Sequence, residues 1–290
     1  MESHTPIYIF NFLAAGGFGL LLATLIPAML SRSIHRSKTW FSMIISWIIY
    51  ALSYLLIVGH QLGPEPPRAG VCVLQMVFIY ASPPLTAISG LAFILDTHFR
   101  ITKALFTRGV DHKYTRILLL VPWVSFAVVA GEALIVVQDF ADIQRNSTHM
   151  YCHSSANVQY LTTALICVIS LGTALCMIAW TAVILYRNWA LFRQLSANSE
   201  RELRLSSLIR IMIFTMMASI GLGLGAFATT PDVASSAIWS ALLPILPFLC
   251  GIAFGTQKDI IRCWMFWKPK VNHPDSSTSS SNHPKVQEEV

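Results

Sequence analysis

Charged residues are scarce in this sequence. Only 12% of its 290 residues are Asp, Glu, Lys or Arg, against about 25% in ordinary soluble domains. Apolar residues make up 54% of the chain, which is more than a soluble core can bury but suits a protein surrounded by lipid. The composition therefore excludes an ordinary soluble domain. The net charge of +6 does not by itself imply a nucleic-acid partner, and none is expected.

Signatures of catalysis and of metal binding are also lacking. The chain has no Gly-rich phosphate loop, no nucleophile motif and no intramembrane cluster of His, Asp and Glu. We therefore expect no enzyme activity, no cofactor and no metal site. The seventh apolar stretch contains no lysine, which excludes a retinal Schiff base of the microbial rhodopsin type. Glu132 and Asp96 are fewer intramembrane carboxylates than an ion-coupled transporter normally needs.

Seven apolar stretches are present, and each is near or above the roughly 20 residues that a helix needs to cross a bilayer. They cover residues 8–30, 40–60, 71–95, 117–138, 158–186, 208–228 and 237–254. Lipid offers no partner to backbone polar groups, so these stretches must be helical. We predict an all-α bundle of seven transmembrane helices within residues 1–270. The serine-rich segment 271–290 is predicted to be a disordered tail.

The distribution of Lys and Arg predicts the orientation in the membrane. Eighteen of the 20 fall in loops and a tail on one side of the seven predicted spans, and Arg68 and Arg145 fall on the other. The positive-inside rule assigns the basic side to the cytosol. The N-terminus is therefore expected outside and the C-terminus in the cytosol, in a multi-pass protein of the plasma membrane.

Two of the six cysteines fall on the predicted outer side. Cys72 begins the third span, and Cys152 lies in the loop after the fourth. Disulfides persist in oxidising surroundings, so we predict a bond between these two residues; the alternative is two free thiols near the membrane. The same loop contains Asn146-Ser147-Thr148, which makes Asn146 a candidate for N-glycosylation.

Several polar residues within the spans are candidates for ligand binding. Glu132 lies near the outer end of the fourth span, where a carboxylate marks a functional site by default. Its alternatives are to reach the outer interface or to bond to a neighbouring helix in protonated form. Gln75, Tyr80 and Ser82 on the third span could line a cavity, and contacts between helices explain them equally well. Pro83-Pro84 is expected to kink that span.

A cytosolic partner would dock among the inner ends of the third, fifth and sixth spans. The candidate contact residues are Asp96, His98, Arg100, Arg187, Arg204 and Arg210. Asp96 is the only acid among them, and its expected partner is Arg100, at i and i+4, or Arg210 across the gap. The alternative for residues 96–100 is a solvated helix end.

The segment after the seventh span predicts a short amphipathic helix on the cytosolic leaflet. Ile260, Ile261, Trp264 and Trp267 recur at helical spacing, with basic residues between them. Cys263 within this helix is a candidate for palmitoylation.

Seven spans, an outer N-terminus and the cysteine pair together resemble a G-protein-coupled receptor. Cys72 and Asp96 are 24 residues apart, the spacing that this class shows between its disulfide cysteine and the acid of its Asp-Arg-Tyr motif. Thr97, however, replaces the central arginine of that motif. The aromatic-Trp-Pro motif of the sixth helix is replaced by Gly-Leu-Gly-Leu-Gly at 221–225, and the nearest match to Asn-Pro-x-x-Tyr is Leu-Pro-Phe-Leu-Cys at 246–250. The chain therefore does not resemble an ordinary animal-type receptor.

The chain is more similar to a receptor-like family of seven-helix proteins from mushroom-forming fungi. The matching stretches are residues 34–40, 149–154, 184–189 and 254–259. The last also resembles the end of the seventh helix in fungal mating pheromone receptors. The resemblance implies a receptor that senses an extracellular ligand of unknown type and engages a heterotrimeric G protein. The alternative is a small-solute transporter or channel.

Overall fold

The structure is a computed structural model that describes residues 5–31, 34, 36–62, 67–106, 112–136, 143–145, 148–154, 157–190, 213 and 237–264. The helices and strands are α1 (Thr5–Leu30), α2 (Lys38–Leu55), α3 (Ala69–Phe106), α4 (His112–Val136), β1 (Ile143–Arg145), β2 (Cys152–Ser154), α5 (Asn157–Arg187), α9 (Ala237–Leu242), α10 (Ile245–Gly255) and α11 (Lys258–Trp264). This part of the chain is almost entirely helical, as predicted. The exception is the antiparallel hairpin β1–β2, which pairs Arg145 with Cys152.

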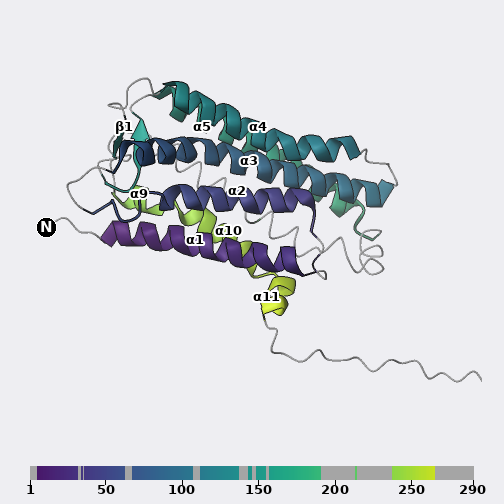
Figure 1. Ribbon diagram of the computed structural model, residues 1–290. Coiled ribbons are helices and arrows are strands. Elements are labelled where there is room, and N and C mark those ends of the chain that lie inside the picture. Colours follow the sequence, from purple (N-terminus) through teal and green to yellow (C-terminus); the bar gives the residue numbers. More distant parts are fainter. Residues whose placement is uncertain are drawn as a thin grey trace, which may run out of the picture.

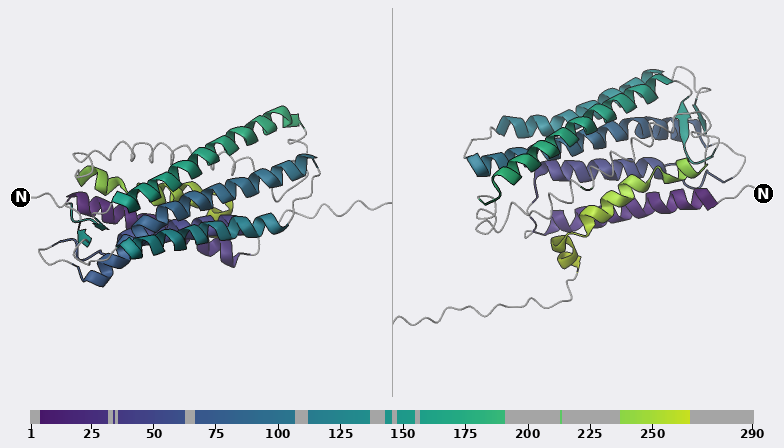
Figure 2. Two further views of the ribbon diagram at one scale, coloured as in Figure 1. Left: turned by 90° about the horizontal axis from the view of Figure 1, so that it is seen from above. Right: turned by 180° about the vertical axis from the view of Figure 1, so that it is seen from behind.

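The long helices form an elongated bundle, seen from three sides in Figures 1 and 2. Each of α1 to α4 packs against the next along the chain, α5 packs on α3, and α10 returns to lie against α1 and α2. The start of α1 and the β1–β2 hairpin lie at one end, which we call the hairpin end (Figure 1). The opposite end contains the α1–α2 connection and α11.

Within the described residues, four helices are long and apolar enough to cross a bilayer, which indicates a membrane protein. They are Thr5–Leu30, Ala69–Lys103, Tyr114–Val136 and Val158–Arg187. They correspond to the first, third, fourth and fifth spans predicted from the sequence. The outer faces of α4 and α5 carry large exposed apolar side chains, such as Ile135 and Leu161. Lipid is the surrounding that such faces require.

The second predicted span is shorter than its apolar pattern suggested. α2 ends at Leu55, and the chain then turns through Gly59, whose φ of +94° lies in the left-handed region that favours glycine. Eleven of the 18 residues of α2 are buried inside the bundle. Among them, Ser46 and Ser53 donate hydrogen bonds to carbonyls of their own helix, so their hydroxyls need no water.

The seventh predicted span, residues 237–254, is divided into two short helices. α9 ends at Leu242 and α10 begins at Ile245, with Pro244 between them. Proline has no N–H to donate and disfavours helix at the residue before it, which explains the interruption. The sixth predicted span, residues 208–228, lies outside the described residues except for Ile213.

The helix α3 remains helical through Pro83 and Pro84, where a kink was predicted. Proline leaves the carbonyl four residues earlier without its usual donor. For Pro84 this is the carbonyl of Tyr80, which accepts a hydrogen bond of 3.0 Å from the Thr163 hydroxyl on α5. A neighbouring helix thus satisfies the group that proline left unpaired, as is typical in membranes.

The helices α1 and α10 approach each other closely at glycines. A Cβ atom built on Gly17 of α1 would lie 2.9 Å from the backbone nitrogen of Phe248. One built on Gly251 of α10 would lie 2.7 Å from the Cβ of Leu20. Small residues let helix backbones approach in this way, which gives van der Waals contact where lipid supplies little hydrophobic driving force.

The short helix α11 packs on the bundle to a greater extent than the sequence indicated. We expected Ile260 to face the membrane surface, but its side chain is 1% exposed and belongs to the core. Ile261 and Trp264 are exposed, and Trp267 lies outside the described residues. The interpretation as a purely lipid-facing helix is therefore wrong for Ile260, because that position of α11 packs on the core of the bundle.

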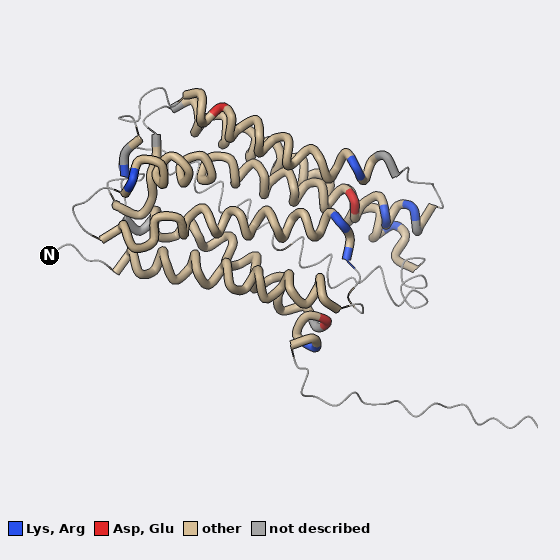
Figure 3. Tube along the Cα trace, viewed as in Figure 1, with Lys and Arg blue, Asp and Glu red and all other residues tan. Residues whose placement is uncertain are grey.

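Positive charge is concentrated at the end opposite the hairpin, which we call the basic end (Figure 3). Nine of the eleven described Lys and Arg residues belong to the α1–α2 connection, the first turn of α2, the ends of α3 and α5, the start of α4, or α11. The other two, Arg68 and Arg145, lie at the hairpin end.

Candidate functional site

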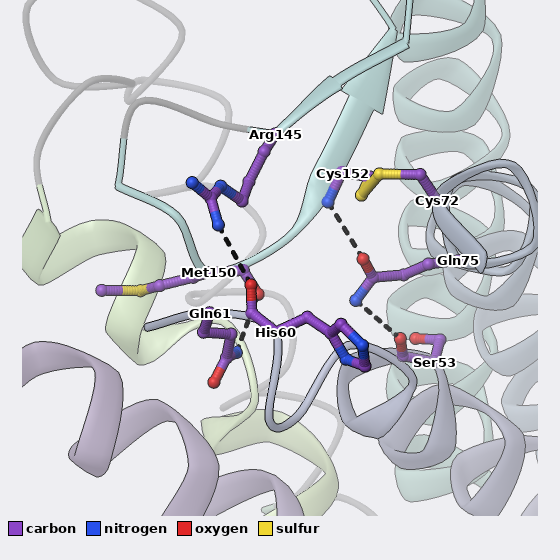
Figure 4. The surroundings of a disulfide bond; sticks show 8 residues. All are labelled: Ser53, His60, Gln61, Cys72, Gln75, Arg145, Met150 and Cys152. Atoms are coloured by element: carbon purple, nitrogen blue, oxygen red, sulfur yellow. Dashed lines mark hydrogen bonds between the residues drawn. A yellow bond between two sulfur atoms is a disulfide. The ribbon is translucent and has the colours of Figure 1, made fainter. Parts of the chain in front are cut away.

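The predicted disulfide is present at the hairpin end, where it joins the first turn of α3 to β2 (Figure 4). Cys72 and Cys152 are both buried, and their Cα atoms are 5.4 Å apart. Gln75, one turn further along α3, is fully buried beside the bond. Its Oε1 accepts from the Cys152 backbone N–H at 3.0 Å, and its Nε2 donates to the Ser53 carbonyl at 3.2 Å. Gln75 therefore holds α2, α3 and β2 together, and also caps a carbonyl near the end of α2.

The turn after α2 makes a second connection at the hairpin end (Figure 4). Gln61 is buried; its Nε2 donates to the Met150 carbonyl at 3.1 Å, and its Oε1 accepts from Nδ2 of Asn11 at 2.7 Å. The Arg145 guanidinium donates to the carbonyl of His60 at 3.0 Å. The loop before β2 is thus tied to α1 as well as to α3, so the hairpin is held from both sides of the bundle.

The residues predicted to contact a ligand make contacts within the protein. Gln75 has the two partners given above, and the Tyr80 carbonyl bonds to α5. Ser82 is fully buried and donates to the carbonyl of Phe78 in its own helix. Glu132 accepts a hydrogen bond of 2.9 Å from the Thr162 hydroxyl, which links α4 to α5. For Gln75 and Glu132 these contacts fit the alternative of contact within the protein, whereas the Tyr80 contact is made by its backbone. The role of all four residues in ligand binding stays a prediction.

Asp96 is the centre of a buried polar network at the basic end. Its side chain lies near the end of α3 that the sequence assigns to the cytosol, and it is 8% exposed. Oδ2 accepts from the Thr39 hydroxyl of α2 at 2.7 Å and lies 3.2 Å from Nε of Arg100. Thr39 Oγ1 is also 2.9 Å from Oγ of Ser37, the N-cap of α2. The predicted pairing of Asp96 with Arg100 is therefore confirmed, and α2 provides a further partner.

A second polar contact at this end joins α11 to the α1–α2 connection. Nη2 of Arg36 donates to Oε1 of Gln257 and lies 3.4 Å from Oδ2 of Asp259, in the first turn of α11. The Arg36 guanidinium also lies 5.6 Å from the centroid of the Trp40 ring, within cation–π range. The first turn of α2 and the residues just before it thus contact α3 through Thr39 and α11 through Arg36.

The other predicted cytosolic residues differ in their surroundings. His98 is buried, and its Nδ1 forms a 2.8 Å hydrogen bond with Oγ1 of Thr181 on α5. The single Thr181 proton is donated to the Met177 carbonyl, so the His98 Nδ1 is the donor in this pair. Arg187 is exposed in the last turn of α5. Arg204, Arg210 and Asn146 lie outside the described residues, and Cys263 is half-buried in α11.

Thr39 and Arg36 are the residues that sequence reasoning missed. A buried carboxylate needs hydrogen-bond donors, so Asp96 required a partner beyond the exposed Arg100. The only sequence signal was position, because Arg36 and Thr39 lie just before the second predicted span on its cytosolic side. Nothing in the sequence indicated which of the polar residues there would face α3.

Together, four long apolar helices among the described residues and buried polar contacts at both ends define a mainly helical membrane protein. No protein-family model matches this chain, and no curated protein matches it either.

Proposed function

We propose that this chain is a seven-helix receptor-like protein of the plasma membrane that senses an extracellular ligand and engages a heterotrimeric G protein. Its hairpin end, with the N-terminus and the disulfide, would face the oxidising outside, and its basic end the cytosol. The four apolar helices support the membrane location. The concentration of Lys and Arg at one end supports the orientation, since positive loops are retained in the cytosol. The protein would have no catalysis of its own.

The observation that carries the proposal is the buried contact of Asp96 with Thr39 and Arg100. Burying the Asp96 carboxylate between α2 and α3 costs desolvation free energy, so this contact is weak evidence for a role in stability. We therefore assign it the role of a contact that opens. A receptor needs such contacts at its cytosolic end. They stabilise the resting arrangement of the helices, and a ligand with higher affinity for the open arrangement shifts the population away from it.

We expect Asp96→Asn to raise basal signalling without changing surface expression. The substitution keeps an acceptor oxygen for Thr39 but removes the charge that strengthens that hydrogen bond and attracts Arg100. Losing about 1 kcal/mol of resting-state stabilisation shifts a two-state equilibrium about fivefold. The measurement is uptake of a GTP analogue by Gα subunits of several classes, reconstituted with wild-type or variant protein without ligand.

The matched control is Thr102→Val, which removes a hydroxyl that donates to the His98 carbonyl of its own helix, and it should leave the rate unchanged. Equal basal rates for Asp96→Asn and wild type, with a Gα to which the wild type couples, would remove Asp96 from the switch. Flux of small solutes into proteoliposomes tests the alternative function. Flux that depends on the protein, with no exchange on any Gα, would replace the receptor by a transporter or channel.

A further inference from the structure

The indole group of Trp264 attaches the short helix α11 to the second half of α1. Nε1 of Trp264 donates a hydrogen bond of 2.9 Å to the backbone carbonyl of Ala23. In an uninterrupted helix that carbonyl would accept from the N–H four residues later. A carbonyl oxygen has two lone pairs, so a side chain can also donate to a helical carbonyl that keeps this bond, as Thr102 does to His98. The indole bond is favoured most where the usual N–H is missing, because the carbonyl then lacks its partner within the helix.

At position 27, a proline removes the usual donor to the Ala23 carbonyl. Pro27 lies inside α1, is buried, and has no N–H to donate to the carbonyl of Ala23. α1 continues to Leu30, and the N–H of Ser31 still bonds to the Pro27 carbonyl at 2.9 Å. The helix therefore has one vacated acceptor, at Ala23, and Trp264 occupies it. Pro84 acts in the same way towards Thr163, so this arrangement occurs twice in the bundle.

Two other contacts hold the opposite part of α11. Arg36 bonds to Gln257 and Asp259 at the start of the helix, and Ile260 is buried in the core. Cys263 packs against the same core and is half-buried. The last turn of α11 is thus held by the indole bond of Trp264 to α1 and by the packing of Cys263 on the core, while its first turn is held by Arg36.

We propose that Pro27 creates the docking point for α11, so that the last turn of this helix is a latch on α1 that is weakened when another donor bonds to the Ala23 carbonyl. An N–H at position 27 is such a donor. The proposal makes an unusual prediction: replacing a proline inside a helix by alanine, which normally strengthens the helix, should here release a neighbouring element. It does not depend on receptor function.

The test measures how fast a maleimide modifies Cys263 in the full-length protein in lipid nanodiscs. Cys176 is exposed and is replaced by serine in all samples, whereas Cys167 and Cys250 are buried. Trp264→Phe should raise the Cys263 rate about fivefold, the effect of losing one hydrogen bond of about 1 kcal/mol. Pro27→Ala should raise it too, because the new N–H competes with the indole for the same oxygen. The double variant should show no further increase over Trp264→Phe, because both changes act on the same bond. Rates are divided by those of the unfolded chain in detergent, which removes effects on intrinsic thiol reactivity.

Two matched controls separate the latch from general changes in helix stability. Pro122→Ala alters a proline inside α4, and Trp180→Phe alters an exposed tryptophan on α5; neither should change the Cys263 rate. An unchanged rate in Trp264→Phe would show that the indole bond does not hold α11. A raised rate in Trp264→Phe with an unchanged rate in Pro27→Ala would show that proline does not create the docking point. Either result overturns the proposal. If Pro27→Ala does not fold, the result for Trp264→Phe still decides whether the indole bond holds α11.

Discussion

Replacing Gly17 by alanine is expected to lower the midpoint of thermal unfolding by several degrees. The added Cβ would lie 2.9 Å from the Phe248 nitrogen and 3.1 Å from its Cα, both backbone atoms that no rotamer change can move. α1 and α10 must then separate along their contact, at about the 1–3 kcal/mol typical of overpacking a well-packed core. In a protein of this size that is a shift of about 2–5 °C. The measurement is the loss of the monodisperse chromatographic peak on heating in detergent.

Gly19 offers a control within the same helix. It is exposed, and nothing lies within 4 Å of a Cβ built there. Gly19→Ala should therefore leave the unfolding midpoint unchanged or raise it slightly, since alanine favours helix over glycine by about 0.5–1 kcal/mol. The two substitutions add the same methyl group two residues apart and should act in opposite directions. Equal midpoints would mean that the close contact of α1 with α10 does not contribute to stability.

We expect Cys152→Ser to reduce surface expression severely, whereas Cys176→Ser should leave it near wild type. Cys152 is fully buried in the disulfide that closes a loop between residues 80 positions apart, and Cys176 is exposed with a free thiol. Removing a disulfide of this kind costs about 2–4 kcal/mol, a large part of the stability of a typical domain. Flow cytometry of an epitope placed at the N-terminus, which we propose to be extracellular, measures the effect. Similar expression of both variants would contradict this account.

Gln75→Leu should also weaken the attachment of β2 to α3, in this case by removing hydrogen bonds and not the disulfide. The substitution leaves the Cys152 N–H and the Ser53 carbonyl buried without their partner, at about 1–3 kcal/mol for each unsatisfied group. Because both changes loosen β2 from α3, Cys152→Ser combined with Gln75→Leu should cost less than the sum of the two. Additive losses in thermal stability would mean that the disulfide and Gln75 hold the hairpin independently.

Features that depend on local sequence were predicted well. The first, third, fourth and fifth spans follow from the length of apolar runs, because any such run must become a helix in lipid. The Asp96–Arg100 pair follows from i,i+4 spacing on one helix. The predicted length of the second span was less accurate, since apolar residues continue past Leu55 into a turn at Gly59.

The sequence by itself determined that this is a helical membrane protein, which parts of it are apolar enough to cross a bilayer, and which ionisable residues lie near the ends of the spans. Only the tertiary structure decided which helix each polar group faces. Thr39 bonds to Asp96 on another helix, and Trp264 bonds to a carbonyl of α1, 241 positions earlier in the chain. In lipid, apolar faces gain little by choosing one neighbour over another, so helix order depends on close contacts such as Gly17 and on the pairing of a few polar groups. Those pairings join residues far apart in sequence, and no spacing along the chain predicts them.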